Sequence, residues 1–337
     1  MRQGPLEDRL VALLEVAFRA EPTEAGVPDR VWDAALWDVL RDFLSRPGKG
    51  VRARLTTAGW RLAGRSVMDL PPVLPLLVEL IHAGSLMVDD VQDAAETRRG
   101  APASHRIFGE PLAINAGSWL YFAPFVLLQR LPISPATRLA LYDHMTRALL
   151  RCHEGQALDL AVRVTELDHD EVGATVATTT RAKTGALMRL AVELGAIAGG
   201  ASDAEVEALG RFGEEAGVAL QMYDDLSGLV RPDLAHKAHE DLAGECPTWA
   251  WAWLTEAHGR ELFVELRDQL SEMAPSSLEE EALRARLAAH VAEHGRVRAR
   301  ATLDAACAAL VEASPPSVAR DDLCTLVRTL EAAYGVG

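Results

Sequence analysis

The stretch Met87-Val88-Asp89-Asp90-Val91-Gln92-Asp93 places three carboxylates within five residues, directly after an apolar segment. On a helix, Asp89 and Asp93 lie four residues apart on one face, where like charges repel unless a divalent cation lies between them. The apolar residues Ile81 to Val88 that lead into the cluster indicate a buried helix rather than a solvated one. The stretch therefore predicts a metal site at the end of a buried helix.

A second acidic cluster, Asp224 and Asp225, follows another segment with helical apolar spacing, Phe212 to Met222. An acidic run on a helix is often only a solvated face, but apolar flanks favour the end of a buried helix here as well. If the two helices face each other, their carboxylates can hold magnesium ions that bind a diphosphate.

Composition limits the class of protein. The chain has 337 residues, of which 49% are hydrophobic and 25% charged, and no long linker interrupts it, so we expect one compact domain over residues 1–337. The formal net charge of −15 argues against a nucleic-acid partner, because phosphate backbones need clustered Lys and Arg. The N-terminus has no apolar core of a signal peptide, and no apolar run reaches the roughly 20 residues that span a bilayer. We expect a cytoplasmic protein without an integral membrane segment.

Apolar periodicity along the chain is almost wholly helical, which predicts an all-α fold. The expected helices are Trp32 to Leu44, Leu74 to Val88, Ala113 to Leu131, Ala136 to Val164, Asp170 to Ala198, Ala204 to Leu226, and several from Trp249 to Tyr334. Asp170 and Ser202 are expected N-caps. The segment from Leu278 to Leu310 predicts a pair of amphipathic helices with a small-residue face.

The cysteines have no spacing typical of a metal site or a redox motif, so we expect ordinary thiols and no disulfide framework. They are Cys152, Cys246, Cys307 and Cys324.

Several cations occupy places where an anion-binding site would need them. Lys49 and Arg52 lie at the start of a predicted helix, whose N-terminal amides would add to anion binding. Arg98 and Arg99 follow the first acidic cluster, and Lys183 lies within a predicted helix. Each alone is explained by a cap, a surface pair or a snorkelling lysine. Their order along the chain is the specific signal.

That order resembles the trans-isoprenyl diphosphate synthase family, also called polyprenyl synthetases, from about Trp32 to Trp253. Six motifs match in sequence: Gly48 to Arg52, Asp89 to Asp93, Arg98 to Gly100, Gly155 to Leu160, Lys183-Thr184, and Gln221 to Asp225. The resemblance implies an all-α isoprenoid synthase fold, a bundle of long antiparallel helices around a deep central cavity, usually in a homodimer. It implies a magnesium-dependent prenyltransferase that condenses an allylic diphosphate with isopentenyl diphosphate, head to tail and trans.

The resemblance also assigns roles to residues of this chain. Magnesium would be bound by Asp89, Asp93 and Asp224, with support from Asp90 and Asp225. The catalytic group would comprise these ligands with Asp90 and Lys183. The allylic diphosphate would be held by Arg98, Lys183, Thr184, Gln221 and Lys237. The diphosphate of isopentenyl diphosphate would be held by Lys49, Arg52, His82 and Arg99. Without the resemblance, His82 alone would be interpreted as a core histidine.

Some positions depart from the family pattern. Gly228 stands where a third Asp is usual in the second cluster, and Cys246 where a lysine is expected. These departures leave two alternatives open: a class I terpene synthase-like enzyme that ionises and cyclises or quenches one prenyl diphosphate, and a non-catalytic subunit of a heteromeric prenyl diphosphate synthase. The four residues assigned to isopentenyl diphosphate favour condensation, because a cyclase has no use for a second diphosphate site.

Product length is predicted from the residues one turn before Asp89. By the resemblance these residues form the floor of the prenyl pocket, and here they are Gly84 and Ser85. A small floor predicts a product of geranylgeranyl length or longer. The aromatic residues Trp119, Tyr121 and Phe122 on the following helix could close the pocket lower down, or could belong to the core or to a dimer interface.

Overall fold

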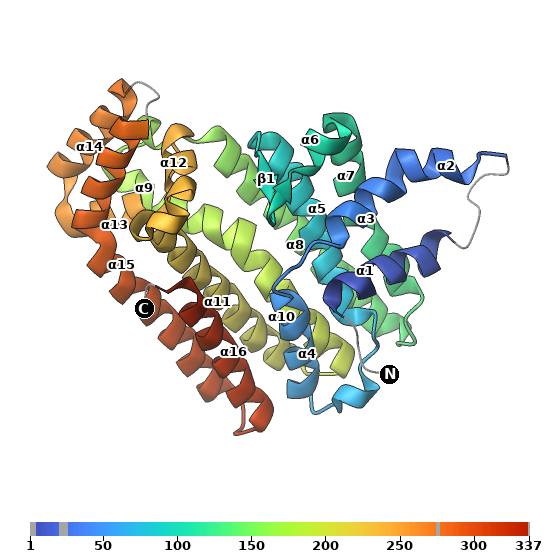
Figure 1. Cartoon of the computed structure of the whole chain (residues 1–337). Helices are drawn as coiled ribbons and strands as arrows, with labels where there is room; N and C mark the ends of the chain where they lie inside the picture. The colour runs from blue at the N-terminus through green and yellow to red at the C-terminus, as the bar shows by residue number, and fades with distance from the viewer. Residues whose placement is uncertain (1–4, 20–25, 274–276, 336–337) are drawn as a thin grey trace. The chain divides into compact units, whose positions relative to one another are not determined.

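The computed structural model describes residues 5–19, 26–273 and 277–335, and these residues are almost entirely helical (Figure 1), as the periodicity predicts. The α-helices are α1 Leu6–Leu14, α2 Asp29–Trp32, α3 Asp38–Leu44, α4 Val51–Leu62, α5 Leu74–Gln92, α6 Ser104–Phe108, α7 Glu110–Gln129, α8 Pro135–Ala161, α9 His169–Thr180, α10 Ala186–Gly199, α11 Asp203–Val230, α12 Ala235–Ala243, α13 Trp249–His258, α14 Arg260–Glu272, α15 Ser277–Ala313 and α16 Val318–Tyr334.

Short segments of other types join these helices. Three single π-helical turns are Glu15–Arg19, Asp33–Trp37 and Arg181–Gly185, and three 3₁₀ turns are Val67–Asp69, Val164–Glu166 and Pro232–Leu234. Strands β1 (Thr97–Arg98) and β2 (Ala101–Pro102) form one antiparallel hairpin.

The chain divides into two compact units, which we describe separately. Unit 1 comprises residues 1–143 and 194–200, and unit 2 comprises residues 144–193 and 201–337. Two of the three boundaries fall within helices α8 and α10, and the third falls between α10 and α11. The single domain expected over residues 1–337 stays a prediction.

Helix α9 begins earlier than expected. Its N-cap is Asp168, not Asp170, because Asp168 and Glu171 form a capping box, in which the Asp168 backbone N–H donates to Glu171 Oε2 at 2.9 Å. The second expected cap is confirmed: Ser202 Oγ accepts the Glu205 backbone N–H at the start of α11.

Helices α5 and α7 pack closely in unit 1. A Cβ atom added to Gly84 would lie 2.6 Å from the carbonyl oxygen of Gly117 and 2.9 Å from Leu120 Cβ. The space beside Gly84 is therefore filled by α7, and this glycine serves helix packing. The expectation that Gly84 leaves room for a prenyl tail is corrected, and Ser85 alone retains that predicted role.

Helix α15 in unit 2 is one continuous helix, so the expected helix pair from Leu278 to Leu310 is wrong. The internal Gly295 does not break it, because α13 packs against this position. A Cβ atom on Gly295 would lie 2.6 Å from the ring of Trp253. The glycine thus accommodates a buried tryptophan ring rather than a turn.

Helix α7 is long and apolar enough, by length and composition alone, to cross a membrane. In the structure 44% of the 18-residue apolar stretch of this helix is buried. Core helices of globular proteins can be equally long and apolar. No integral membrane segment is evident in the described residues.

Candidate active site

The first acidic cluster lies at the C-terminal end of α5 in unit 1. Asp90 is fully buried, and its Oδ1 accepts a hydrogen bond of 2.6 Å from Arg98 Nε. Burial raises the pKa of Asp90, while this hydrogen bond from Arg98 opposes the rise. Asp89 is partly exposed and lies 3.9 Å from Arg98 Nη2, and Asp93 caps the helix end. The cluster therefore has a buried member that orients Arg98 and more accessible members on either side.

The hairpin places Arg98 and Arg99 beside this cluster. Arg99 and Gly100 both have positive φ, at 54° and 77°, and a two-residue turn with this geometry matches the twist of the strands that it joins. Arg99 is held by its Nη1 hydrogen bond to the Arg46 carbonyl at 3.4 Å, and its guanidinium lies 5.4 Å from the centre of the Phe43 ring. The turn thus fixes two adjacent guanidinium groups that leave the strand in different directions.

The start of α4 is partly occupied by carboxylates of the protein itself. The Ala53 backbone N–H donates to Glu79 Oε1 at 2.8 Å, and the Gly48 N–H donates to Glu7 Oε1 at 2.9 Å. Two backbone amides near the start of this helix are therefore already paired, and the contribution of its N-terminal amides to anion binding stays a prediction. The side chains of Lys49 and Arg52 remain the predicted anion ligands here.

His82 lies in a cationic part of unit 1. Burial lowers its pKa well below the ordinary value, and the charges of Arg52, Arg99 and Arg98 lower it further. The ring is accordingly neutral at neutral pH, in a form with one N–H donor. The structure thus brings together three of the predicted arginines with His82, and the sequence had no signal for the protonation state.

This environment has a consequence for stability. The free energy of unfolding is expected to fall as the pH drops below about 6.5, the ordinary histidine pKa. In the unfolded chain His82 then binds a proton, whereas the folded chain keeps it neutral, so acid favours the unfolded state. Urea unfolding of wild type and His82→Gln between about pH 5 and 7 checks this, and the variant should show the smaller slope. Equal slopes in the two proteins would refute the assignment.

In unit 2, several predicted site residues lie in or near the π-helical turn Arg181–Gly185, which follows α9. Such turns are frequent at functional sites because they re-aim side chains. Lys183 Nζ lies 2.5 Å from Asp159 Oδ2 on α8. A Cβ atom on Gly155 would lie 2.6 Å from the Lys183 backbone nitrogen, so only glycine permits this approach one turn before Asp159. Asp159 is a further candidate, which lies within the recognised motif Gly155 to Leu160 but has no role predicted from the sequence.

Helix α11 carries Gln221 and the second acidic cluster. Thr184 Oγ1 donates to Gln221 Oε1 at 3.1 Å, and Gln221 Nε2 donates to Asp225 Oδ1 at 2.8 Å. The Trp249 backbone N–H donates to Asp225 Oδ2 at 3.0 Å. Burial raises the pKa of Asp225 to about 7 against these two hydrogen bonds to it. Asp225 is thus held in place by two hydrogen bonds, and its supporting role stays a prediction.

Asp241 on α12 joins the same group of carboxylates. Burial raises its pKa well above the ordinary value, and the charges of Asp225, Asp224 and Asp159 raise it further. The excess of negative charge in one place is the environment in which bound cations are stabilised. The sequence did not predict that the charge of Asp159 acts on Asp241.

Asp224, the predicted metal ligand of this helix, is paired with Lys237 Nζ at 2.8 Å. Gly228 lies one turn later, and a Cβ atom there would be 3.3 Å from Lys237 Cβ and 3.5 Å from the Ala238 nitrogen. A side chain at position 228 would therefore lie directly against α12. The same close packing brings Lys237 to Asp224.

The aromatic residues of α7 have different surroundings. Trp119 lies in a cluster with Phe18 and Trp37, at ring-centroid distances of 4.9 and 5.9 Å. Phe122 is 69% exposed in the single chain, which favours an interface role over a pocket role. The pocket assignments of Trp119 and Phe122 stay predictions.

The carboxylates suit magnesium, which prefers oxygen ligands. Among the described residues no three His, Cys, Asp or Glu side chains converge as a ready metal cage. This agrees with the usual habit of magnesium at phosphate sites, where one or two carboxylates are completed by substrate oxygens and water. In addition, the buried Oδ2 of Asp90 has no hydrogen-bond partner in the described structure, and a water on a bound ion would satisfy it.

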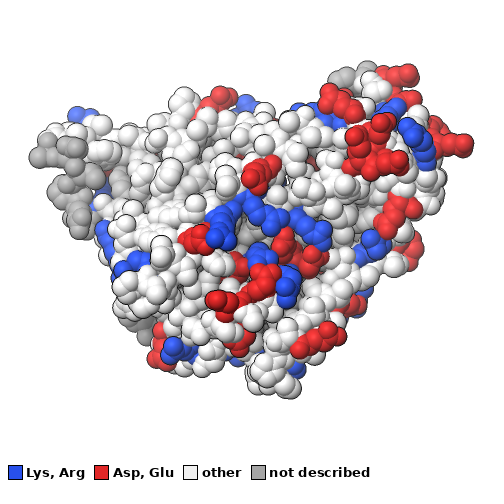
Figure 2. All heavy atoms as spheres, turned by 180° about the vertical axis from the view of Figure 1, so that it is seen from behind, with Lys and Arg blue, Asp and Glu red and all other residues white. Residues whose placement is uncertain are grey.

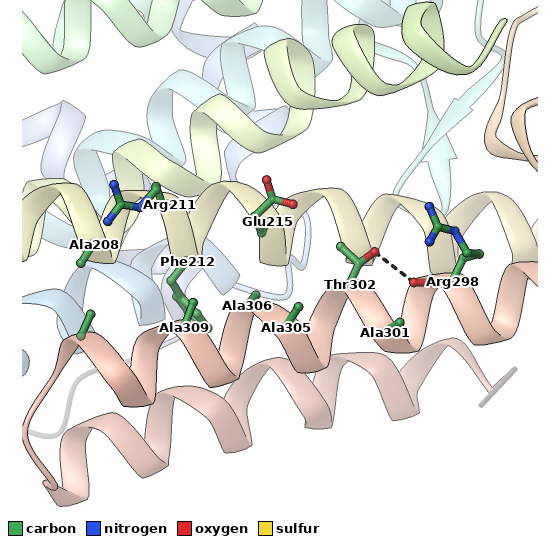
Figure 3. A pocket seen from close by; sticks show the side chains of 11 residues that line it. Ala208, Arg211, Phe212, Glu215, Arg298, Ala301, Thr302, Ala305, Ala306 and Ala309 are labelled. Carbon is green, nitrogen blue, oxygen red and sulfur yellow. Dashed lines mark hydrogen bonds between the residues drawn. The ribbon is translucent and has the colours of Figure 1, made fainter. Parts of the chain in front are cut away.

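The structure also shows a charged face and a cavity. On the face in Figure 2, Lys and Arg side chains are intermingled with Asp and Glu, so the coloured residues form no continuous basic field of the kind that nucleic acid needs. A cavity of about 430 Å³ lies between α11 and α15, where the Phe212 side chain points toward Ala309 (Figure 3). Its lining includes none of the predicted site residues.

Comparisons with known proteins agree with the motif order. The polyprenyl synthetase family model matches residues 33–281. The geranylgeranyl diphosphate synthase of Methanosarcina mazei is 32% identical over 202 residues, which cover 59% of this chain and 60% of that protein. The chain thus spans about three fifths of the length of the first curated relatives that it matches.

Solved structures confirm the predicted fold. The geranylgeranyl pyrophosphate synthetase of Pyrococcus horikoshii superimposes with a TM-score of 0.79 at 23% identity, covering 96% of this chain and 94% of that chain. A polyprenyl synthase of Caulobacter crescentus, complexed with calcium and isoprenyl diphosphate, gives a TM-score of 0.75 at 25% identity, covering 98% and 99%. The all-α isoprenoid synthase fold is therefore confirmed.

Proposed function

Because the chain belongs to the polyprenyl synthetase family, we propose that it is a trans-prenyltransferase that condenses an allylic prenyl diphosphate with isopentenyl diphosphate, head to tail. The polyprenyl synthase of Caulobacter crescentus was solved with calcium, a divalent cation. We propose that this chain also binds a divalent cation and that the ion is Mg²⁺. The proposed product is a prenyl diphosphate of geranylgeranyl length or longer, and the proposed location is the cytoplasm.

One observation carries the proposal: unit 1 holds a carboxylate cluster and also a cationic group around His82. Arg98 is bound to Asp90, and the charges of Arg52, Arg99 and Arg98 all act on His82. A metal-bound allylic diphosphate needs the carboxylate cluster, and a second diphosphate needs the cationic group. An enzyme that only cyclises one substrate would keep the acidic cluster without a reason to keep the second group.

The residues of the chain act mainly on the departing diphosphate. As the allylic carbon–oxygen bond breaks, negative charge grows on the diphosphate, and the fixed donors of Arg98 and Lys183 stabilise it. Asp90 orients Arg98, and Asp159 orients Lys183, so neither cation must reorganise during the reaction. Lys183 has three N–H donors and can bind Asp159 and a phosphate oxygen together. Asp89, Asp93 and Asp224 would hold Mg²⁺. The bound ion would supply additional positive charge to the oxygens of the leaving diphosphate.

The second substrate then reacts with the carbocation. Lys49, Arg52, His82 and Arg99 hold its diphosphate, and its alkene attacks the allylic cation. Neutral His82 donates a hydrogen bond without adding charge to the arginine group. Loss of one proton to the departed diphosphate restores an alkene, so the chain needs no separate catalytic base.

The dependence on isopentenyl diphosphate tests this function. Wild type with farnesyl diphosphate and magnesium is expected to release inorganic diphosphate rapidly only when isopentenyl diphosphate is also present, because the alkene captures the cation. A coupled assay of inorganic diphosphate measures this. Rapid release from the allylic substrate alone would instead favour the terpene synthase-like alternative. No release under either condition from folded, magnesium-loaded protein would favour the non-catalytic subunit.

We further propose that the chain forms a homodimer through α7. Ile114, Phe122 and Val126 are spaced by multiples of four on this helix, and their exposed fractions are 44%, 69% and 37%. A row of exposed apolar side chains on one helix face is typical of an interaction surface. A second copy of the chain is the partner that buries the same face on both sides.

Phe122→Glu is expected to convert the dimer to a monomer, because it places two charges in one symmetric apolar interface. Sedimentation velocity at micromolar protein measures the change in mass. Met68→Glu is a matched control, since Met68 is also an exposed apolar residue of unit 1 but lies outside α7. A wild-type monomer, or a Phe122→Glu dimer, would contradict the proposed interface.

A further inference from the structure

Two cysteines that are distant in the sequence come from neighbouring helices of unit 2. Cys307 lies on α15 and is 5% exposed, whereas Cys324 lies on α16 and is partly accessible. Both are free thiols in the structure. Their sequence spacing matches no redox motif, so only the packing of the two helices relates them.

The ion pairs between these helices fix their register. Arg300 Nη1 lies 2.9 Å from Glu331 Oε1, and Arg328 Nη2 lies 2.9 Å from Asp304 Oδ1. Rising residue numbers on α15 therefore meet falling numbers on α16, which is an antiparallel arrangement. Cys307 lies one turn after Asp304 on α15, and Cys324 lies one turn before Arg328 on α16. The same register consequently sets the two thiols opposite each other.

The thiols are also chemically unequal. Their hydrogen bond to each other, with further help from Arg328 and Arg320, lowers the pKa of Cys324 to about 7, against burial. The same hydrogen bond, together with burial, raises the pKa of Cys307. The more accessible sulfur carries the thiolate character, as in an attacking cysteine with a buried resolving partner.

We propose that Cys307 and Cys324 form a dithiol site that a low-molecular-weight disulfide, such as oxidised glutathione, converts into an intrachain disulfide between α15 and α16. The inference is independent of the proposed function. The Cys324 thiolate attacks one glutathione sulfur, the glutathione S–S bond breaks, and the first glutathione leaves and takes up a proton. Cys307 then loses its proton and attacks the Cys324 sulfur, which releases the second glutathione. The protein is oxidised by two electrons, and glutathione disulfide is reduced to two thiols.

The new bond would secure the C-terminal helix. At present α16 is held to α11 by the hydrogen bond of 2.7 Å from the Tyr223 hydroxyl to Glu331 Oε1, next to the second acidic cluster. Disulfides stabilise by restricting the unfolded chain, and this one would close a short loop. We expect oxidation to raise Tm by about 5 °C, reversibly with a thiol reductant.

The full chain is incubated with excess oxidised glutathione, alkylated without reduction, digested, and analysed by mass spectrometry. The expected result is a peptide pair linked through Cys307 and Cys324, with the rise in Tm, and its loss on reduction. Cys324→Ser should abolish the link and the rise in Tm, whereas Cys152→Ser, which alters another partly exposed thiol of unit 2, should keep both.

Three outcomes would overturn the proposal. The first is full alkylation of both thiols after oxidation. The second is a stable glutathione adduct on Cys324 that never closes to Cys307. The third is a disulfide between different chains. These outcomes are all read on wild-type protein, so they do not depend on whether a cysteine variant folds.

Discussion

Replacing Asp89 with asparagine is expected to lower kcat/KM for prenyl transfer by about 10³-fold, with little change in stability. Asparagine keeps the shape of the side chain but removes the charge that a divalent ion needs, and loss of such stabilisation in a transition state costs several kcal/mol. Asp89 also lies 3.9 Å from Arg98, so the substitution weakens the field around the diphosphate-binding cation. Initial rates over a range of magnesium and substrate concentrations measure the effect.

The matched control for Asp89→Asn is Glu272→Gln, an exposed carboxylate at the end of α14 that we assign no role. It should retain the wild-type rate. Both variants should unfold at the wild-type temperature, because Asp89 is partly exposed and the buried contact to Arg98 belongs to Asp90. A folded Asp89→Asn enzyme with activity within tenfold of wild type would contradict the metal role of the first cluster.

Asp224→Asn is expected to lower kcat/KM by about 10²- to 10³-fold and to raise the magnesium concentration that gives half the maximal rate. Gly228 stands where a third aspartate is usual, and Asp225 is held by hydrogen bonds from Gln221 and from the Trp249 backbone, so Asp224 is the carboxylate of this cluster that we propose as the metal ligand. The second cluster should therefore depend on this one residue.

Lys237 allows the metal role to be separated from a local structural role. If Asp224 acted only by holding Lys237, then Lys237→Met would reproduce the whole defect without a change in magnesium dependence. Asp233→Asn is the matched control, because this exposed aspartate pairs with Arg231 just beyond the same helix. Wild-type magnesium dependence in Asp224→Asn would rule out a metal role for the second cluster.

Helices could be predicted from the sequence because their apolar period persists over many residues. The predicted segment Ala204 to Leu226 corresponds to α11, and the one from Ala113 to Leu131 to α7. The π-helical turn at Lys183 could not be predicted, because it lies inside a segment whose helical periodicity predicts one uninterrupted helix from Asp170 to Ala198. Tertiary contacts with Asp159 and Gly155, rather than local preference, specify what this turn does.

The candidate site was recognisable as an ordered set of motifs, but not as a set of contacts. Asp90 and Asp89 look equivalent in the sequence, and only burial and the bond to Arg98 distinguish them. Glu79 lies in none of the recognised motifs, because its role arises from a contact between α5 and the start of α4. Gly84 was interpreted as open space, whereas the neighbouring helix α7 occupies it.

We propose that this chain joins two diphosphate substrates. To test this, purified protein and magnesium are incubated with farnesyl diphosphate, with and without isopentenyl diphosphate, and the products are identified by mass. We expect prenyl diphosphates of geranylgeranyl length or longer, formed only when isopentenyl diphosphate is present and nearly absent in Asp89→Asn. Hydrocarbons or prenyl alcohols formed from farnesyl diphosphate alone would contradict it.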